Sequence, residues 1–342
     1  MGSDMGPGAL LPHGGRLRAA AARYGRPLGD WLDLSTGINP RGWTTGAPLP
    51  PDLWQRLPEE DDGLEAAAAR YYGANRTGGA GALLPVAGSQ AAIQALPRLR
   101  QAGRVGVIAP GYGEHAHAWR QAGHAVQLLP VATIETALPD LDVLVLIHPN
   151  NPTGARFARA DLLRWHAMLA ERGGWLVVDE AFIDATPEAS LAALSPLPGL
   201  ILLRSLGKFF GLAGARVGFV LADPVVTHPL AALIGPWTIA APARWVATAA
   251  LADEPWQAET RARLAIDGPR LAELLTYRGL PPQGGCALFQ WVPTDRAALL
   301  HEHLARAGIL TRLFDAPTAL RFGLPGTEAQ WARLAAALEE ST

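Results

Sequence analysis

Small and polar side chains follow the short apolar runs in the first two thirds of the sequence. Each run has the length of a buried strand, and helical patterns separate one run from the next. In an open α/β sheet the groups that follow the strands meet at one edge, and ligands bind there. The residues that share this placement are Gly88, Ser89, Gln90, Tyr112, Asn151, Asp179, Ser205, Lys208 and Arg216.

One part of this set has the chemistry of a phosphate site. Gly88 and Ser89 precede a helical pattern, so backbone N–H groups and the positive end of the helix dipole can face an anion. The hydroxyl of Ser205 and the permanent cation of Arg216 can complete the cup. The sequence therefore predicts that a phosphate group binds beside residues 88–90.

The other part of the set suits a flat heterocycle that carries an aldehyde. Tyr112 can stack on a ring, and Asp179 can hold a protonated ring nitrogen. Asn151 can donate a hydrogen bond to a ring oxygen, and Lys208 can form an imine. Pyridoxal phosphate (PLP) has each of these groups, and a lysine with an acidic partner for the ring nitrogen marks PLP sites. Each side chain alone has an ordinary structural explanation, and the ordered set carries the prediction.

The elements that must position this set alternate between apolar strands and helices. Continuous apolar strands separated by helices are typical of parallel strands covered on both faces. The predicted fold class is α/β, with a large PLP-binding domain at 46–236 that holds a mostly parallel seven-stranded sheet between helices. We expect its strands at 82–86, 104–109, 125–130, 143–147, 175–178, 200–203 and 217–221.

The pattern changes after Pro236, where helical sequence fills most of 243–280. The first forty residues lack a core of their own. We therefore expect 1–45 to pack with 237–342 as a small α+β domain. Its strands are expected at 286–292, 309–314 and 319–322, and its later helices at 295–307 and 328–339.

Composition argues against several classes of function. The formal net charge of −2 disfavours nucleic acid or an anionic membrane as a partner, because both require a basic face. Cys286 is the only cysteine and no apolar run reaches membrane-spanning length, so a cytoplasmic protein is expected. His115 and His117 would point in different directions on a helix. That spacing disfavours a metal site and favours packed or solvated histidines, and no metal is expected.

Three strings in the sequence resemble a known family. They are HPNNPTG at 148–154, VVDEAF at 177–182 and SLGKFFGLAGARVG at 205–218. Together they resemble the fold-type I PLP-dependent enzymes, the aspartate aminotransferase superfamily. Within it, the strongest resemblance is to the L-threonine-O-3-phosphate decarboxylases of cobalamin biosynthesis, which are related to the histidinol-phosphate aminotransferases. The likeness covers nearly the whole chain.

The resemblance implies a role for each matching residue. Lys208 corresponds to the catalytic lysine that carries PLP as a Schiff base, and Asp179 to the catalytic partner of the ring nitrogen. Tyr112 corresponds to the stacking ring, and Asn151 to the donor to the phenolic oxygen. The predicted phosphate cup corresponds to that of the family. The implied substrate-binding residues are His13, Gly14, Gly15, Ile38, Asn151, Arg312 and Arg321.

Two features favour the decarboxylases among these relatives. The HGG string at 13–15 is similar to the opening of the decarboxylases, where backbone N–H groups can approach a substrate phosphate. Phe182 stands where the aminotransferases usually have a tyrosine that reaches the phenolic oxygen. We therefore expect PLP-dependent decarboxylation of a phosphorylated amino acid, L-threonine O-3-phosphate, to (R)-1-amino-2-propanol O-2-phosphate and carbon dioxide. The sequence does not decide which of Arg312 and Arg321 contacts the carboxylate.

Other features depart from the family or favour alternatives. Gly207 stands where relatives often have Ser or Thr, and Leu57 stands where many have a tyrosine that reaches the cofactor of the neighbouring subunit. The family nevertheless implies a homodimer with active sites near the interface. An aminotransferase of the histidinol-phosphate type is the main alternative. A nicotinamide-dependent dehydrogenase is a weaker one, since Gly111 and Gly113 form only a partial dinucleotide-binding pattern.

Overall fold

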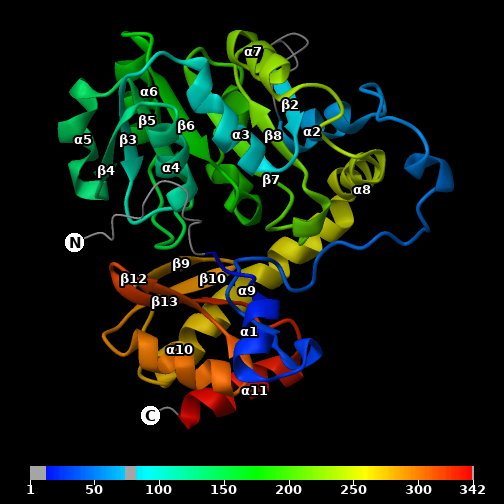
Figure 1. Cartoon of the computed structure of the whole chain (residues 1–342), viewed down its shortest axis with the longest axis vertical. Helices are drawn as coiled ribbons and strands as arrows, with labels where there is room; N and C mark the ends of the chain where they lie inside the picture. The colour runs from blue at the N-terminus through cyan, green and yellow to red at the C-terminus, as the bar shows by residue number, and fades with distance from the viewer. Residues whose placement is uncertain (1–12, 74–81, 341–342) are drawn as a thin grey trace. The chain divides into compact units, whose positions relative to one another are not determined.

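The computed structural model describes residues 13–73 and 82–340, and the chain divides into two compact units (Figure 1). Unit 1 comprises the chain up to Arg41, Pro152–Ala155 and Ala262 onward. Unit 2 comprises Gly42–Asn151 and Arg156–Arg261. The division differs from the expected one, which assigned 237–261 to the small domain.

The segment at 237–261 belongs to unit 2 because its helix packs there. Helix α8 (Ala241–Ala252) lies against α2 (Leu64–Tyr72). Arg244 on α8 donates to Asp62 at 2.6 Å and to Glu65 at 2.9 Å. These ion pairs of the buried Arg244 hold α8 in unit 2. The change in composition at Pro236 gave no sign of this contact.

Within the described residues, seven strands of unit 2 form one sheet in the order β2-β8-β7-β6-β5-β3-β4 (Figure 1). The pairs among β4, β3, β5, β6 and β7 are parallel, and β8 is antiparallel to both β7 and β2. The expected mostly parallel seven-stranded sheet is therefore confirmed. The strands are β2 (Leu83–Val86), β3 (Arg104–Ile108), β4 (Ala125–Leu129), β5 (Val143–Ile147), β6 (Trp175–Asp179), β7 (Leu200–Ser205) and β8 (Gly218–Leu221).

The central strands of this sheet are buried on both faces. Val143 and Val145 of β5 belong to a core cluster with residues of α3, α4 and α7, whereas Leu144 and Leu146, which alternate with them, are buried on the other face. This alternation explains the continuous apolar runs. The remaining helices of unit 2 are α3 (Ser89–Ala95), α4 (Gly113–Gln121), α5 (Ile134–Ala137), α6 (Arg159–Ala170) and α7 (Pro224–Ile234).

Unit 1 contains a four-stranded sheet in the order β12-β13-β10-β9 and a short β1–β11 pair, counted over the described residues. The bounds are β1 (Leu32–Asp33), β9 (Gly284–Cys286), β10 (Phe289–Pro293), β11 (Ile309–Leu310), β12 (Arg312–Asp315) and β13 (Thr318–Gly323). Its helices are α1 (Leu17–Tyr24), α10 (Ala297–Arg306) and α11 (Glu328–Glu339), and α9 (Glu254–Tyr277) spans the boundary in sequence.

Two expected strands of unit 1 are divided in the structure. The run at 286–292 is a hairpin, because β9 and β10 pair antiparallel with Cys286 opposite Phe289. The run at 309–314 is interrupted at Thr311, so that β11 pairs with β1 and β12 pairs with β13. Among the described residues, no helix combines the length and the apolar character needed to cross a membrane.

The burial of β5 gives a test of the sheet. Leu144→Ala removes a side chain with 0% exposure and should lower the free energy of unfolding by about 2–5 kcal/mol. Leu128→Ala is the matched control, because Leu128 of β4 is 50% exposed; it should cost about 1 kcal/mol or less. Urea unfolding followed by circular dichroism measures both. Equal losses would contradict the assignment of β5 as a central strand and β4 as an edge.

Candidate active site

Asp179 is the last residue of β6, and its carboxylate is buried with two hydrogen-bond partners. Its side chain lies 3.0 Å from Nε2 of His115, and the backbone N–H of Ala181 donates to it at 3.0 Å. His115 lies on α4 with 1% exposure. With its proton on Nε2, the imidazole donates to Asp179 and fixes the plane of the carboxylate. The other carboxylate lone pairs can then accept from a ligand.

The sequence prediction for His115 was incomplete. It treated the histidine as packed or solvated, and the structure shows it packed but bonded to Asp179. One signal was available, because His115 comes one helical turn after Tyr112, and residues at that spacing share a face. The two rings are in edge contact, with centroids 6.1 Å apart.

Tyr112 is held by a chain of side-chain hydrogen bonds. Its hydroxyl donates to Oε1 of Gln90 at 3.0 Å, and Nε2 of Gln90 donates to Glu114 at 3.1 Å. Burial, with Glu114 and Asp179 nearby, raises the pKa of Tyr112 to about 12, so the phenol is neutral. The side chain of Gln90 thus orients the ring of Tyr112, and its backbone N–H can still face an anion, as the predicted phosphate cup requires.

The residues predicted to form a phosphate cup lie where three strands of the sheet meet. Ser205 ends β7 and pairs with Gly218 of β8, which pairs with Val86 of β2. Gly88 follows β2 with φ 72°, a conformation that favours glycine. The guanidinium of Arg216 lies over Gly88, since a Cβ built on Gly88 would be 2.4 Å from Nη2. The backbone at 88 and a fixed cation are thus brought together, as an anion site requires.

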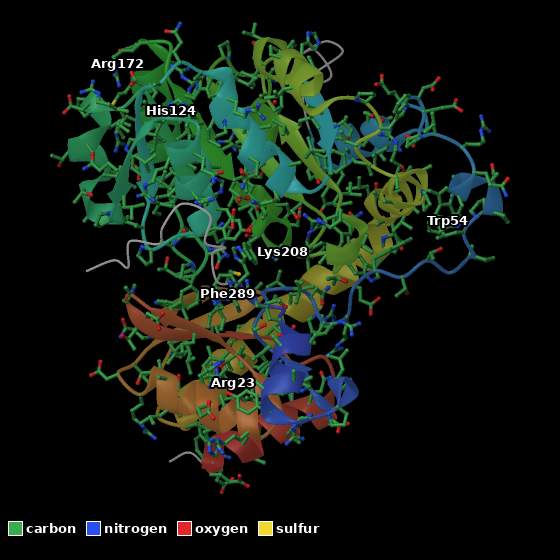
Figure 2. All side chains as sticks on the ribbon, viewed as in Figure 1. Arg23, Trp54, His124, Arg172, Lys208 and Phe289 are labelled. Atoms are coloured by element: carbon green, nitrogen blue, oxygen red, sulfur yellow. The ribbon has the colours of Figure 1, made fainter. Side chains whose placement is uncertain are left out.

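The loop after β5 completes the same edge. Asn150 donates to the carbonyl of Pro110 at 2.9 Å and so ties this loop to the one after β3. Asn151 follows it directly and is partly buried. Lys208 lies shortly after the end of β7 (Figure 2). Its Nζ is 5.3 Å from the centroid of the Phe182 ring. Phe182 is 3% exposed and presents a ring without a hydroxyl beside the lysine.

The residues of unit 2 fit PLP in their chemistry. The close approach of Gly88 and Arg216 forms a cradle for a phosphate that a larger side chain would fill. Asp179, with His115 behind it, can hold a protonated ring nitrogen. The amine of Lys208 can form an imine with the aldehyde. Among the described residues, no group of three or more His, Cys, Asp or Glu side chains could hold a metal ion.

Gly207 precedes Lys208 and has little room for a side chain. A Cβ there would lie 3.3 Å from Cα of Ala213 and 3.3 Å from Oγ of Ser205. The Oγ of Ser205 accepts from the N–H of Gly207 at 3.2 Å. Glycine at position 207, where relatives often have Ser or Thr, is therefore consistent with the close packing of this turn around Ser205.

Unit 1 brings several of the expected substrate-binding residues together around Ser35, whereas Asn151 belongs to unit 2. Arg321 donates to the carbonyl of Ser35 at 2.7 Å, and the N–H of Gly15 donates to the hydroxyl of Ser35 at 2.7 Å. A Cβ on Gly14 would lie 2.3 Å from the Ser35 carbonyl oxygen, so only glycine fits there. His13 and Ile38 flank this segment in sequence and are partly buried.

Arg312 and Arg321 are directly opposite each other on β12 and β13. Arg321 is 6% exposed, and burial, together with the positive charge of Arg312, lowers its pKa to about 10. It remains protonated at neutral pH. Like charges opposite each other in a sheet repel, so an anion bound to the pair would be stabilised.

Gly88 allows a direct test of the phosphate cup. Gly88→Ala places a methyl group against Arg216 and should weaken the binding of PLP on the order of tenfold, because the phosphate loses both the cation and the close backbone. Gly123→Ala is the matched control: Gly123 has φ 88°, but a Cβ there meets nothing within 4 Å. Equilibrium dialysis gives both dissociation constants. Similar losses in the two variants would mean that backbone strain alone is responsible.

Comparisons with known proteins agree with this geometry. The family model of aminotransferase class I and II matches residues 32–338. The chain is 59% identical over 330 residues to a threonine-phosphate decarboxylase of Pseudomonas aeruginosa, with 96% of this chain and 97% of the relative covered. It is 45% identical to a threonine-phosphate decarboxylase of a Sinorhizobium species, over 96% and 98% of the two chains.

Two solved structures share the fold at low sequence identity. The L-threonine-O-3-phosphate decarboxylase of Porphyromonas gingivalis superposes with a TM-score of 0.74 at 22% identity, covering 90% of this chain and 98% of that one. The histidinol-phosphate aminotransferase of Sinorhizobium meliloti, solved in complex with pyridoxal-5'-phosphate, gives a TM-score of 0.79 at 21% identity, covering 99% and 97%. The family match over most of the chain shows that the protein belongs to the aminotransferase class I and II family.

Proposed function

We propose that this chain is a PLP-dependent decarboxylase that converts L-threonine O-3-phosphate to (R)-1-amino-2-propanol O-2-phosphate and carbon dioxide, as a cytoplasmic enzyme of cobalamin biosynthesis. The observation that carries the proposal is the 59% identity to a threonine-phosphate decarboxylase over nearly the full length of both chains. The cofactor set of unit 2 and the arginine pair of unit 1 supply the chemistry that this reaction requires.

The residues of unit 2 would bind and tune the cofactor. When bound, PLP supplies an electron-poor ring that accepts the electrons of the bond broken at the substrate Cα. Lys208 would hold the cofactor, and its amine, once displaced by the substrate, can donate a proton to Cα. Asp179 would keep the ring nitrogen protonated, and His115 fixes the orientation of Asp179.

The residues of unit 1 would bind the two anionic groups of the substrate. Arg312 and Arg321 supply two permanent cations. Gly14 lies in the segment that Ser35 ties to Arg321, whereas the N–H of Gly15 already donates to the Ser35 hydroxyl. A decarboxylase must fix the rotation of the substrate about Cα so that the bond to the carboxylate, and not the bond to hydrogen, is the one that breaks. Two fixed anion contacts at opposite ends of a small substrate can set that rotation.

Phe182 separates the proposed reaction from transamination. A tyrosine at this position could donate a hydrogen bond to the phenolic oxygen of the cofactor, whereas Phe182 cannot. The ring instead lies beside the amine of Lys208 as an apolar wall. The chain is also 32% identical to a histidinol-phosphate aminotransferase of Shewanella amazonensis, but over 77% of this chain. The alternative of a nicotinamide-dependent dehydrogenase is not retained, because the aminotransferase family match at 32–338 includes Gly111 and Gly113, on which that alternative was based.

An assay with and without an amino acceptor tests the function. Purified protein loaded with PLP should release carbon dioxide from L-threonine O-3-phosphate and form no 2-oxo acid. Lys208→Ala is the control, because it should abolish both the release and the trapping of PLP by borohydride. Strict dependence on 2-oxoglutarate would overturn the decarboxylase proposal in favour of an aminotransferase.

The surface of unit 2 supports a homodimer. Three large apolar side chains of unit 2 are more than half exposed, namely Trp54, Leu57 and Trp237. Trp237 lines a groove, and Leu57 directly precedes Pro58, which also lines it. The groove has a volume of about 820 Å³ and is lined by Pro58–Asp61, Leu83–Pro85 and Ile234–Ile239 among other residues. Exposed apolar patches of this kind mark interaction sites. We place the second copy of the chain on this surface.

The dimer can be tested with a charge placed on the groove. Trp237→Glu should convert the protein to a monomer, because it buries a carboxylate in the proposed interface. Tyr277→Glu is the matched control, since Tyr277 is an aromatic residue of unit 1 with 82% exposure. Sedimentation velocity measures both. A wild-type monomer, or a Trp237→Glu dimer, would remove this surface from the proposal.

A further inference from the structure

A cluster of buried charges in unit 2 lies outside the set that would contact the cofactor. Its members are Arg204, Glu180 and Asp184, whose side chains are 2%, 0% and 0% exposed. Taking three charges out of water is costly unless they are paired and hydrogen-bonded with good geometry. Such a cluster contributes little net stability compared with apolar residues of the same volume, so its presence points to a need for directional contacts.

The ion pairs connect the two backbone segments that carry the catalytic residues. Arg204 directly precedes Ser205 at the end of β7, the strand that leads to Lys208. Glu180 directly follows Asp179 at the end of β6, and Asp184 lies beyond Phe182 on the same loop. Nη1 of Arg204 donates to Glu180 at 2.6 Å, and Nη2 donates to Asp184.

Further contacts leave Glu180 with little freedom. Its Oε1 accepts from the N–H of Leu191 at 2.8 Å, and its Oε2 accepts from the hydroxyl of Ser190 at 2.6 Å. Nη1 of Arg204 donates to that same hydroxyl at 3.0 Å. The backbone is bound as well, because the N–H of Glu180 donates to the carbonyl of Leu203 at 2.9 Å. The position of Asp179 is therefore set by the residue that follows it.

Asp184 is fixed from the opposite side of the cluster. The hydroxyl of Tyr71 donates to it at 3.1 Å, and Arg261 donates to that hydroxyl at 3.1 Å and to the Asp184 carbonyl at 2.9 Å. The guanidinium of Arg204 also lies 4.4 Å from the ring centroid of Tyr72. Helix α2, which carries both tyrosines, is thus joined to the loop that holds Phe182.

We infer that Arg204 is a positioning residue for the proposed PLP site: it fixes the ends of β6 and β7 so that Asp179, Phe182 and Lys208 keep one relative geometry. This inference rests on the proposed function. A guanidinium suits the task because its planar fork holds two carboxylates at defined angles, which an apolar side chain or a lysine cannot do. Arg204 acts through Glu180 and Asp184 and is not itself a catalytic residue.

The test compares two clusters of the same composition in unit 2. One variant is Arg204→Met with Glu180→Gln and Asp184→Asn, which removes all three charges and leaves none unpaired. The control is Arg244→Met with Asp62→Asn and Glu65→Gln, since Arg244 also pairs with two carboxylates. The dissociation constant of PLP is measured by equilibrium dialysis, and the absorbance of bound PLP is followed against pH. Because Arg244 and Glu65 also line the groove of the proposed dimer, sedimentation velocity compares the oligomeric state of both variants with that of the wild type.

We expect the Arg204 cluster variant to bind PLP on the order of tenfold more weakly, as is found for the outer partners of metal ligands. The midpoint of its absorbance change with pH should also shift, since Asp179 is misplaced against the ring nitrogen. The control should stay within about twofold of the wild type, because distant sites are independent. A wild-type dissociation constant and pH profile for the Arg204 cluster variant would overturn the inference.

A second variant keeps the inference testable if the Arg204 cluster variant does not fold. Arg204→Lys keeps the positive charge and loses the fork, so it should retain most of the thermal stability and still show weaker PLP binding. Wild-type values for Arg204→Lys would then overturn the inference. If the wild-type protein itself binds no PLP, the proposed function fails as well, and this outcome is distinct from a failure of the Arg204 variants alone.

Discussion

The carboxylate of Asp179 sets the main physical constraint on unit 2. It lies at the end of a central strand with 4% exposure, where an ionised group is costly unless hydrogen bonds replace the water it has lost. His115 and the N–H of Ala181 provide these bonds. His115 must therefore be buried beside the strand end, which fixes the start of α4 and the place of Tyr112. The arrangement of side chains at this end of the sheet therefore follows from the need to stabilise the buried carboxylate of Asp179.

Much of the fold of unit 2 could be predicted from the sequence. Its strands are buried on both faces, so they appear as continuous apolar runs with turn residues between them. The same reasoning was wrong for the strand at 286–292. The turn of that hairpin consists of Ala287 and Leu288, which carry no glycine or proline signal, and Cys286 and Phe289 on either side are both buried. A local pattern cannot distinguish this hairpin from one buried strand.

The candidate site was predicted less completely than the fold. Residue types and their positions after strands were enough to propose Asp179, Tyr112 and Lys208, because their chemistry is carried by the side chain itself. The residues that support this set were not apparent. His115 contacts Asp179 and Arg204 contacts Asp184, in each case across different elements of the chain. The spacing of residues along one helix or strand does not encode such contacts. The use of the Gln90 side chain was missed for the same reason.

The paired arginines on β12 and β13 have a consequence for the conditions under which the protein meets its substrate. Arg321 is buried, so its field is screened by salt less than that of a surface charge. Arg312 is more accessible, and small anions can compete for it. Inorganic phosphate resembles one end of the proposed substrate and should occupy the pair at high concentration. The apparent affinity of the protein for the proposed substrate would then depend on the phosphate concentration around it.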